Sequence, residues 1–253
     1  MSIAETLAAL KDGTDEAKAS AALKLRTSLD GLSPSALNDE IFEAGGVAPL
    51  LVDLLESGSV SNKGKCHAAH ALGYLVLRAA IDPADPICPF FNAIKPLLKL
   101  LRSGHDDAPM AAEFALGHIA RKSSVLHACV IGCDAVPEFV ELIWTLIGDG
   151  KATGFEMQGL LFTLGELAKP TDFDKNASRA TTAIPVLLEL LRSEDSDGAM
   201  AAVSAMKKLA EHEEVKTALI DAGAVVLLGE LLLTQSHGGR DLITQLLWQL
   251  KFK

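Results

Sequence analysis

The chain has 253 residues and a formal net charge of −10, and 49% of its residues are hydrophobic while only 5% are aromatic. The negative charge argues against broad, sequence-independent binding of nucleic acid, because neutralising phosphates requires a basic surface. The apolar residues are mainly Leu, Ala, Val and Ile, a composition that suits closely packed helices.

Signals for secretion or membrane insertion are not found in the sequence. Ser2 and Glu5 at the amino terminus form a helix capping box in place of a charged and then apolar leader. The apolar run 222–233 is interrupted by Glu230 and is shorter than the roughly 18 residues of a membrane span. We therefore expect a cytoplasmic or nuclear protein that is neither secreted nor inserted in a membrane. A reducing compartment also fits the cysteines, which are too few for a disulfide scaffold: Cys66, Cys88, Cys129 and Cys133.

Five similar Leu-rich phrases recur along the chain, at 45–55, 93–101, 135–143, 183–191 and 224–232. Four of them contain a proline at the same place, and Val226 takes that place in the fifth. Measured there, the spacings are 47, 41, 48 and 41 residues, from the positions Pro49, Pro96, Pro137, Pro185 and Val226. Helical solenoid repeats have periods of about 40–47 residues. The sequence therefore predicts a single array of helical repeats over 1–253.

Each phrase is followed by a polar turn and a longer helix whose closing part also recurs, at 71–75, 115–119, 163–167 and 205–209. A short helix precedes the next phrase, most clearly at 40–46 and 215–223, where a glycine stops it. Each unit is thus predicted to be a three-helix module. The approximate units are 1–43, 44–92, 93–134, 135–182, 183–222 and a partial unit 223–253.

Two segments depart from the repeat and account for its two longest spacings. Residues 81–91 contain three prolines, which disfavour the short helix expected there, and residues 169–176 form a polar insertion. Long loops on a rigid scaffold are candidates for contact with a partner, and tolerated insertion is the equal alternative.

At this level of detail the chain resembles the armadillo repeat family over roughly its whole length. The resemblance is strongest in "EAGGVAPLLVDLLESG" (43–58), "AIKPLLKLLRSG" (93–104) and "IDAGAVVLLGELL" (220–232). It implies an all-α fold, a right-handed α-solenoid of about five armadillo-type three-helix repeats. HEAT repeats are the nearest alternative.

The resemblance also implies a concave groove lined by the third helices. In family members that bind extended peptides, a Trp and, four residues later, an Asn recur there. The positions that match the Trp are His70, Phe114, Phe162 and Ser204, and those that match the Asn are Tyr74, His118, Glu166 and Lys208. Since none of them is Asn, the regular capture of a peptide backbone is not carried over to this chain.

One turn further along these helices lie more charged residues. The inferred strip holds Arg78, Lys122 and Lys208 against Glu166. A locally basic, aromatic groove on an acidic protein favours an acidic peptide segment as the partner. The alternative is an ordinary solvated helix face.

Motifs that would indicate phosphate binding, metal binding or catalysis are weak in this sequence. Residues 61–66 only superficially resemble a phosphate loop, His67 and His70 offer two metal ligands, and Cys129 and Cys133 near His127 lack an evident fourth ligand. The acidic clusters 106–107, 172–174 and 194–197 are interpreted as helix caps, and Trp144 and Trp248 as packing residues. We therefore expect no enzyme, no cofactor and no metal.

The predicted function is a non-enzymatic scaffold or adaptor that binds a partner protein through its concave groove. The alternative is a structural subunit packed permanently into a large assembly through its apolar carboxyl-terminal helix, 240–253. Leu247 and Trp248 are the contact residues expected on that helix.

Overall fold

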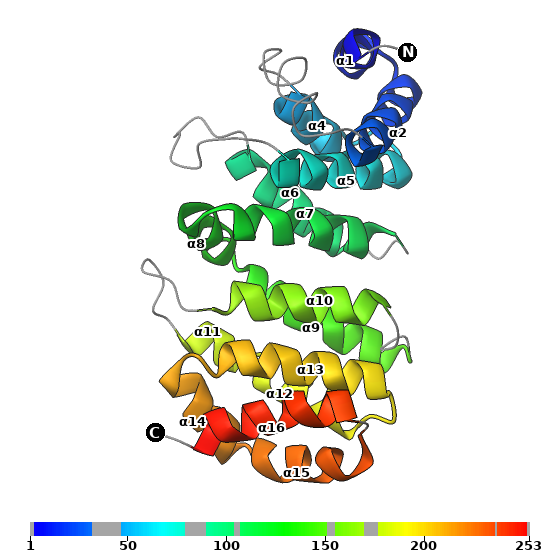
Figure 1. Cartoon of the computed structure of the whole chain (residues 1–253). Helices are drawn as coiled ribbons and strands as arrows, with labels where there is room; N and C mark the ends of the chain where they lie inside the picture. Colours follow the sequence, from blue (N-terminus) through cyan, green and yellow to red (C-terminus); the bar gives the residue numbers. More distant parts are fainter. Residues whose placement is uncertain are drawn as a thin grey trace. The chain divides into compact units, whose positions relative to one another are not determined.

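The computed structural model describes residues 3–31, 47–78, 90–103, 107–150, 155–169, 177–235 and 237–251. Throughout these residues the regular elements are α-helices and no strand occurs (Figure 1). The all-helical prediction is therefore confirmed for the described part of the chain. The helices form two compact units, Met1–Cys133 and Asp134–Lys253. That the whole chain behaves as one array stays a prediction.

The first unit is built around three long helices that pack side by side in chain order: α2 (Asp15–Gly31), α5 (Asn62–Arg78) and α7 (Ala108–Lys122) (Figure 1). Small residues such as Ala69 and Ala112 are fully buried between them, which allows the close approach. The remaining helices pack on these three: α1 (Ile3–Asp12), α4 (Val47–Glu56), α6 (Phe90–Leu101) and α8 (Ser124–Gly132).

The second unit repeats this arrangement. Its long helices α10 (Phe155–Leu167), α13 (Ser196–Leu209) and α16 (His237–Lys251) pack in chain order, as Figure 1 shows in green, yellow and red. Short helices corresponding to the predicted first helices are α8 in the first unit and α11 (Ala177–Thr181) and α14 (Glu213–Asp221) in the second. The predicted second helices are α9 (Ala135–Gly148), α12 (Ile184–Arg192) and α15 (Ala224–Thr234).

The recurring phrase folds as predicted because its apolar residues bury one side of a short helix. In α12, Leu187 and Leu190 are buried while Glu189 stays exposed, and a proline stands in the first turn. The next helix is capped by Asp195, whose carboxylate accepts hydrogen bonds from the backbone N–H groups of Asp197 and Gly198 at 3.2 and 3.0 Å. The capping interpretation of the 194–197 cluster is confirmed for Asp195.

Helix ends follow the predicted glycine stop in one clear case. Gly223 has a φ of 83° at the junction of α14 and α15, a conformation that favours glycine. At the corresponding junction of α8 and α9, Asp134 adopts a φ of 61°. The same backbone turn therefore occurs in two repeats with different residues.

Several sequence predictions need correction. Phe90 and Phe91, assigned above to the Pro-rich segment, begin helix α6, because burial of Phe90 (1% exposed) anchors an extra turn before Pro96. Asp107 stands at the start of α7, but its side chain makes no capping hydrogen bond. The predicted packing roles of the two tryptophans are wrong, since Trp144 is 41% and Trp248 56% exposed. On α9 the buried stripe ends at Ile143, one position before Trp144.

Other predictions fall on residues that the structure leaves undescribed. These are the capping serine Ser2, the short helix 40–46, most of the two departing segments (81–89 and 170–176), Cys88, and the acidic residues 106 and 172–174.

Among the described residues, no single helix has the length and hydropathy to cross a membrane, although α14 and α15, bent by 75° at their junction, pass that test as a pair.

Candidate binding faces

Four of the predicted groove residues form an aromatic cluster in the first unit. His70 and Tyr74 lie on α5, Phe114 and His118 lie on α7, and all four are half-buried. The Phe114 ring is the centre, with centroid distances of 5.7 Å to His70, 5.1 Å to Tyr74 and 4.6 Å to His118. The 75° angle between Phe114 and His118 is an edge-to-face contact. The cluster thus presents partly exposed rings in fixed orientations.

Gly73 makes this cluster compact. A Cβ atom at Gly73 would lie 2.6 Å from Cε1 of Phe114 and 3.3 Å from the Ala115 Cα atom. The Phe114 ring therefore lies directly against the backbone of α5, where a side chain would otherwise stand. This close approach explains why Gly73 occurs in the recurring segment 71–75.

The two histidines of the cluster are held neutral. Burial, assisted by the Arg121 charge, lowers the pKa of His118 to about 4 from its ordinary 6.5. Burial also lowers the pKa of His70, although the hydrogen bond between its Nδ1 atom and the Cys66 carbonyl oxygen (3.0 Å) opposes the shift. At neutral pH the cluster is therefore uncharged, with Nδ1 of His118 placed 3.3 Å from a guanidinium nitrogen of Arg121.

Positive charge gathers beside the cluster at the ends of the same two helices. Arg78 closes α5, and Arg121 and Lys122 close α7. Arg78 and Lys122, both predicted groove residues, are half-buried, and Arg121 is exposed. The first unit thus places uncharged aromatic rings next to three cations.

A second group, the ion-paired cluster, lies on α10 and α13 of the second unit. It consists of Phe162, Glu166, Lys169 and Lys208. Lys208 donates to one carboxylate oxygen of Glu166, and Lys169 donates to the other at 3.0 Å. Although burial raises the pKa of Glu166, these hydrogen bonds outweigh it and lower that pKa. The Lys208 ammonium also lies 3.7 Å from the Phe162 ring centroid, a cation–π contact.

This pairing changes the predicted charge of the strip in the second unit. Glu166 was expected to oppose a set of separate cations, and it instead neutralises one of the two lysines bound to it. Gly165, one residue earlier, is where the helices meet, because a Cβ there would lie 3.2 Å from the Ala205 Cα atom. The group carries one net positive charge.

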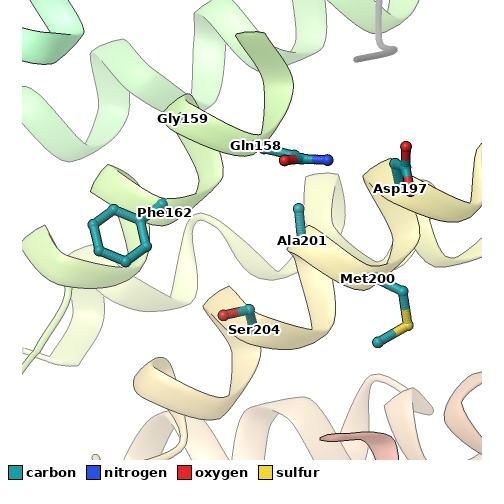
Figure 2. A pocket seen from close by; sticks show the side chains of 7 residues that line it. All are labelled: Gln158, Gly159, Phe162, Asp197, Met200, Ala201 and Ser204. Atoms are coloured by element: carbon teal, nitrogen blue, oxygen red, sulfur yellow. The ribbon is translucent and has the colours of Figure 1, made fainter. Parts of the chain in front are cut away.

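Ser204, the remaining predicted groove residue, lies in a hollow between α10 and α13 of about 460 Å³. Figure 2 shows Ala201 at the centre, the Phe162 ring at one side and Met200 at the other. Most of the residues that line it were not predicted: Gln158, Gly159, Asp197, Met200 and Ala201. They continue the faces of Phe162 and Ser204 by one or two turns toward the helix starts, so helical periodicity could have found them.

Several large apolar side chains of α15 and α16 are exposed, and together they are called the carboxyl-terminal apolar face. Ile243, Leu246 and Leu250 of α16 are buried, Leu247 is half-buried, and Trp248 is exposed beneath the Lys251 ammonium, 5.9 Å from the ring centroid. Only Ala224 and Leu228 are buried on α15. The other members of this face were missed by the sequence analysis: Val225 (43% exposed), Val226 (65%) and Leu233 (82%).

In the described part of the chain, no group of three or more His, Cys, Asp or Glu side chains is arranged to hold a metal ion. Cys66, Cys129 and Cys133 are free thiols, and burial raises the pKa of Cys66 and of Cys129. These thiols are therefore less reactive than exposed ones.

No family model matches the sequence. Solved structures do match it over almost its full length. An engineered protein from a structural genomics consortium has a TM-score of 0.80 and 25% identity, with 99% of this chain and 97% of that chain covered. A designed armadillo repeat protein in complex with the peptide (KR)4 has a TM-score of 0.80 and 20% identity, with 99% and 100% covered.

Armadillo repeat proteins that were computationally designed for modular peptide recognition are a further match. The TM-score is 0.76 at 20% identity, with 98% of this chain and 99% of that chain covered. These likenesses confirm the predicted fold class. The chain has an armadillo-like helical-repeat fold, an α-solenoid.

Proposed function

We propose that this chain is a non-enzymatic scaffold that binds peptide segments of partner proteins. One binding face is formed by α5 and α7 in the first unit, and a separate one by α10 and α13 in the second. The aromatic cluster is the observation that carries the proposal. Its rings are pre-oriented by contacts to Phe114, so binding a partner would order few additional side chains. Designed proteins of the same fold recognise peptides, which supports a binding role for this scaffold.

The segment bound by the first unit is proposed to be acidic. Arg78, Arg121 and Lys122 together bring three positive charges beside the aromatic cluster. The carboxyl ends of α5 and α7 oppose them with about half a negative charge each. The neutral histidines add no further charge. This balance favours carboxylate side chains in the partner.

The test is a comparison of two labelled octapeptides, (DE)4 and (KR)4, by fluorescence anisotropy with the whole chain. We expect (DE)4 to bind and its affinity to fall several-fold between about 50 and 200 mM salt, because salt screens the exposed Arg121 and the half-buried Arg78 and Lys122. Tighter binding of (KR)4 that Tyr74→Ala weakens, and that therefore lies on the first unit, would contradict the acidic preference. An affinity for (DE)4 that salt does not change would contradict it as well.

A second candidate function is a subunit of a larger assembly. It is favoured by the carboxyl-terminal apolar face, where Val226 and Leu233 leave 65% and 82% of their surface exposed. Exposed apolar patches of this kind commonly mark interfaces. Light scattering coupled to size exclusion separates the two functions, since a scaffold is monodisperse alone and a subunit without its partners self-associates.

A further inference from the structure

We propose that the hollow between α10 and α13 is a side-chain pocket that takes a bulky apolar residue of the bound peptide and selects a basic residue next to it through Asp197. This inference rests on the proposed function, because it requires a partner peptide to lie on these two helices. It adds the chemical identity of the residues recognised in the second unit.

The hollow exists because small residues line its middle. Gly159 on α10 and Ala201 on α13 are half-buried and leave the space between the helices open, as Figure 2 shows. The same two helices touch at Gly165 and Ala205, one to two turns further along. The opening is therefore a local feature of this pair of repeats. Its volume of about 460 Å³ lies within the range of about 300–1,000 Å³ that ligand sites occupy.

The walls of the hollow are apolar and adaptable. Phe162 leaves 46% of its surface exposed, and its ring is fixed on one side by the Lys208 ammonium. Met200, on the other side, is half-buried, and its unbranched thioether can adjust to differently shaped side chains. An aliphatic or aromatic side chain in the hollow would bury the exposed surfaces of these two residues, and this burial would contribute favourably to the binding free energy.

The polar rim is suited to a peptide. Within the described part of the chain, the hydrogen bonds leave the Ser204 hydroxyl, the Gln158 side chain and the Asp197 carboxylate unused. Gln158 and Ser204 can each donate and accept, as the peptide backbone requires. These side chains would therefore fix the backbone on either side of the occupant.

Charge selects the neighbour of that occupant. Asp197 is exposed at the rim, and Glu194 and Asp195 lie within one turn of it, with Asp195 engaged in capping α13. At the other end of the helices, the ion-paired cluster carries one net positive charge. A Lys or Arg beside the apolar residue would complement the Asp197 end through a charge-assisted hydrogen bond, whereas an acidic residue would be repelled.

The test begins with a phage library of random heptapeptides panned on the whole chain, and the retained peptides are then compared on the Ala201→Leu variant, which fills the hollow. Ala218→Leu on α14 is the matched control, because it makes the same change at another half-buried helical site of the second unit. We expect the retained peptides to place Leu, Met or Phe next to Lys or Arg. Synthetic copies should bind Ala201→Leu about tenfold more weakly or worse, and Ala218→Leu like the wild type.

The location is checked by NMR of the whole chain with ¹³C-labelled methionine methyl groups. The selected peptide should shift the Met200 signal to saturation, while Met110 in the first unit stays unchanged. Asp197→Asn should weaken binding of the selected basic peptide about three- to tenfold. It should not change the affinity of a copy of that peptide in which Gln replaces the basic residue. Asp241→Asn, which removes a charge early in α16, is the control and should change neither affinity.

Equal binding of the selected peptides to Ala201→Leu and wild type would overturn the pocket, as would saturation without a Met200 shift. If Tyr74→Ala and His118→Ala weakened binding of the same peptides in that case, the proposed function would stand without the pocket. If the whole chain retained no peptide in the panning experiment and did not bind (DE)4, both the pocket and the proposed peptide-binding function would be overturned.

Discussion

Gly73 shows at the scale of one residue how an absent side chain positions a binding face. The Phe114 ring occupies the space that a Cβ atom at Gly73 would need. We predict that Gly73→Ala lowers the free energy of unfolding by about 1–3 kcal/mol, because the ring and the α7 backbone must move apart. Urea unfolding followed by circular dichroism measures the change.

Gly229→Ala is the matched control for that prediction. Gly229 also lies inside a helix, and apart from its chain neighbours and the backbone of its own helix, no atom lies within 4 Å of the position of its added Cβ. This substitution should be neutral or stabilising by up to about 1 kcal/mol, since Ala is the better helix former. Equal changes in the free energy of unfolding for Gly73→Ala and Gly229→Ala would show that the close contact with Phe114 does not determine the cost of adding a Cβ at Gly73.

His118 predicts a dependence of stability on pH. Its pKa is about 4 in the folded chain and about 6.5 when exposed, so the unfolded chain takes up the proton first as pH falls. The stabilisation from the neutral ring is therefore complete above pH 6.5 and is lost between pH 6.5 and 4. Discounted for the solvent that reaches the half-buried ring, the loss is about 1–2 kcal/mol.

The measurement is the difference in unfolding free energy between pH 7.5 and pH 4.5 for wild type and for His118→Gln. Titrating carboxylates contribute to both proteins, so only the wild-type excess reports on His118. An imidazole NMR titration midpoint near 6.5 for His118 would contradict this account.

At the same scale, the sequence predicted which residues form the aromatic cluster, but it did not predict the contacts that these and the other groove residues make. His70 and Tyr74 lie four residues apart on one helix, which places them on one face from periodicity alone. The contacts of Phe114, the Lys208–Glu166 pair and the hollow depend on how neighbouring helices align. That alignment is set by close approaches at Gly73 and Gly165, which a single sequence does not reveal.

At the scale of elements, α15 and α16 leave several large apolar side chains exposed. We predict that replacing Trp248 and Leu247 by Gln reduces self-association, because Trp248 is 56% exposed and contributes to the carboxyl-terminal apolar face. Sedimentation velocity over a range of protein concentrations measures the change.

Trp144→Gln is the control for this experiment, since Trp144 is also exposed, at 41%, but lies on α9. It should leave the association unchanged. A wild-type chain that is monomeric at every concentration, or a double variant that associates as strongly as wild type, would remove the basis for the assembly function.

Helix positions were largely predictable because the phrase itself encodes an amphipathic helix, as in α4 and α12. The start of α6 was not, since it depends on burial of Phe90 against the rest of the unit. Local apolar spacing predicts that a helix forms, and tertiary contacts decide where it begins.

At the scale of the whole molecule, we predict that unfolding is one cooperative event or a closely coupled series, because neighbouring units of a single repeat array would share interfaces. Differential scanning calorimetry measures this directly. Two well-separated transitions would mean that Met1–Cys133 and Asp134–Lys253 unfold as independent domains, contrary to the single array predicted from the repeats.

The central claim is that the third-helix faces bind a partner peptide, and the affinity of the whole chain for (DE)4 with and without the aromatic side chains tests it most directly. Tyr74→Ala and His118→Ala should each weaken binding by about 1–2 kcal/mol, or about 5- to 30-fold. The Tyr74→Ala, His118→Ala double variant should bind more weakly still, with its helical circular dichroism retained. Equal affinity of the double variant and the wild type would contradict the account.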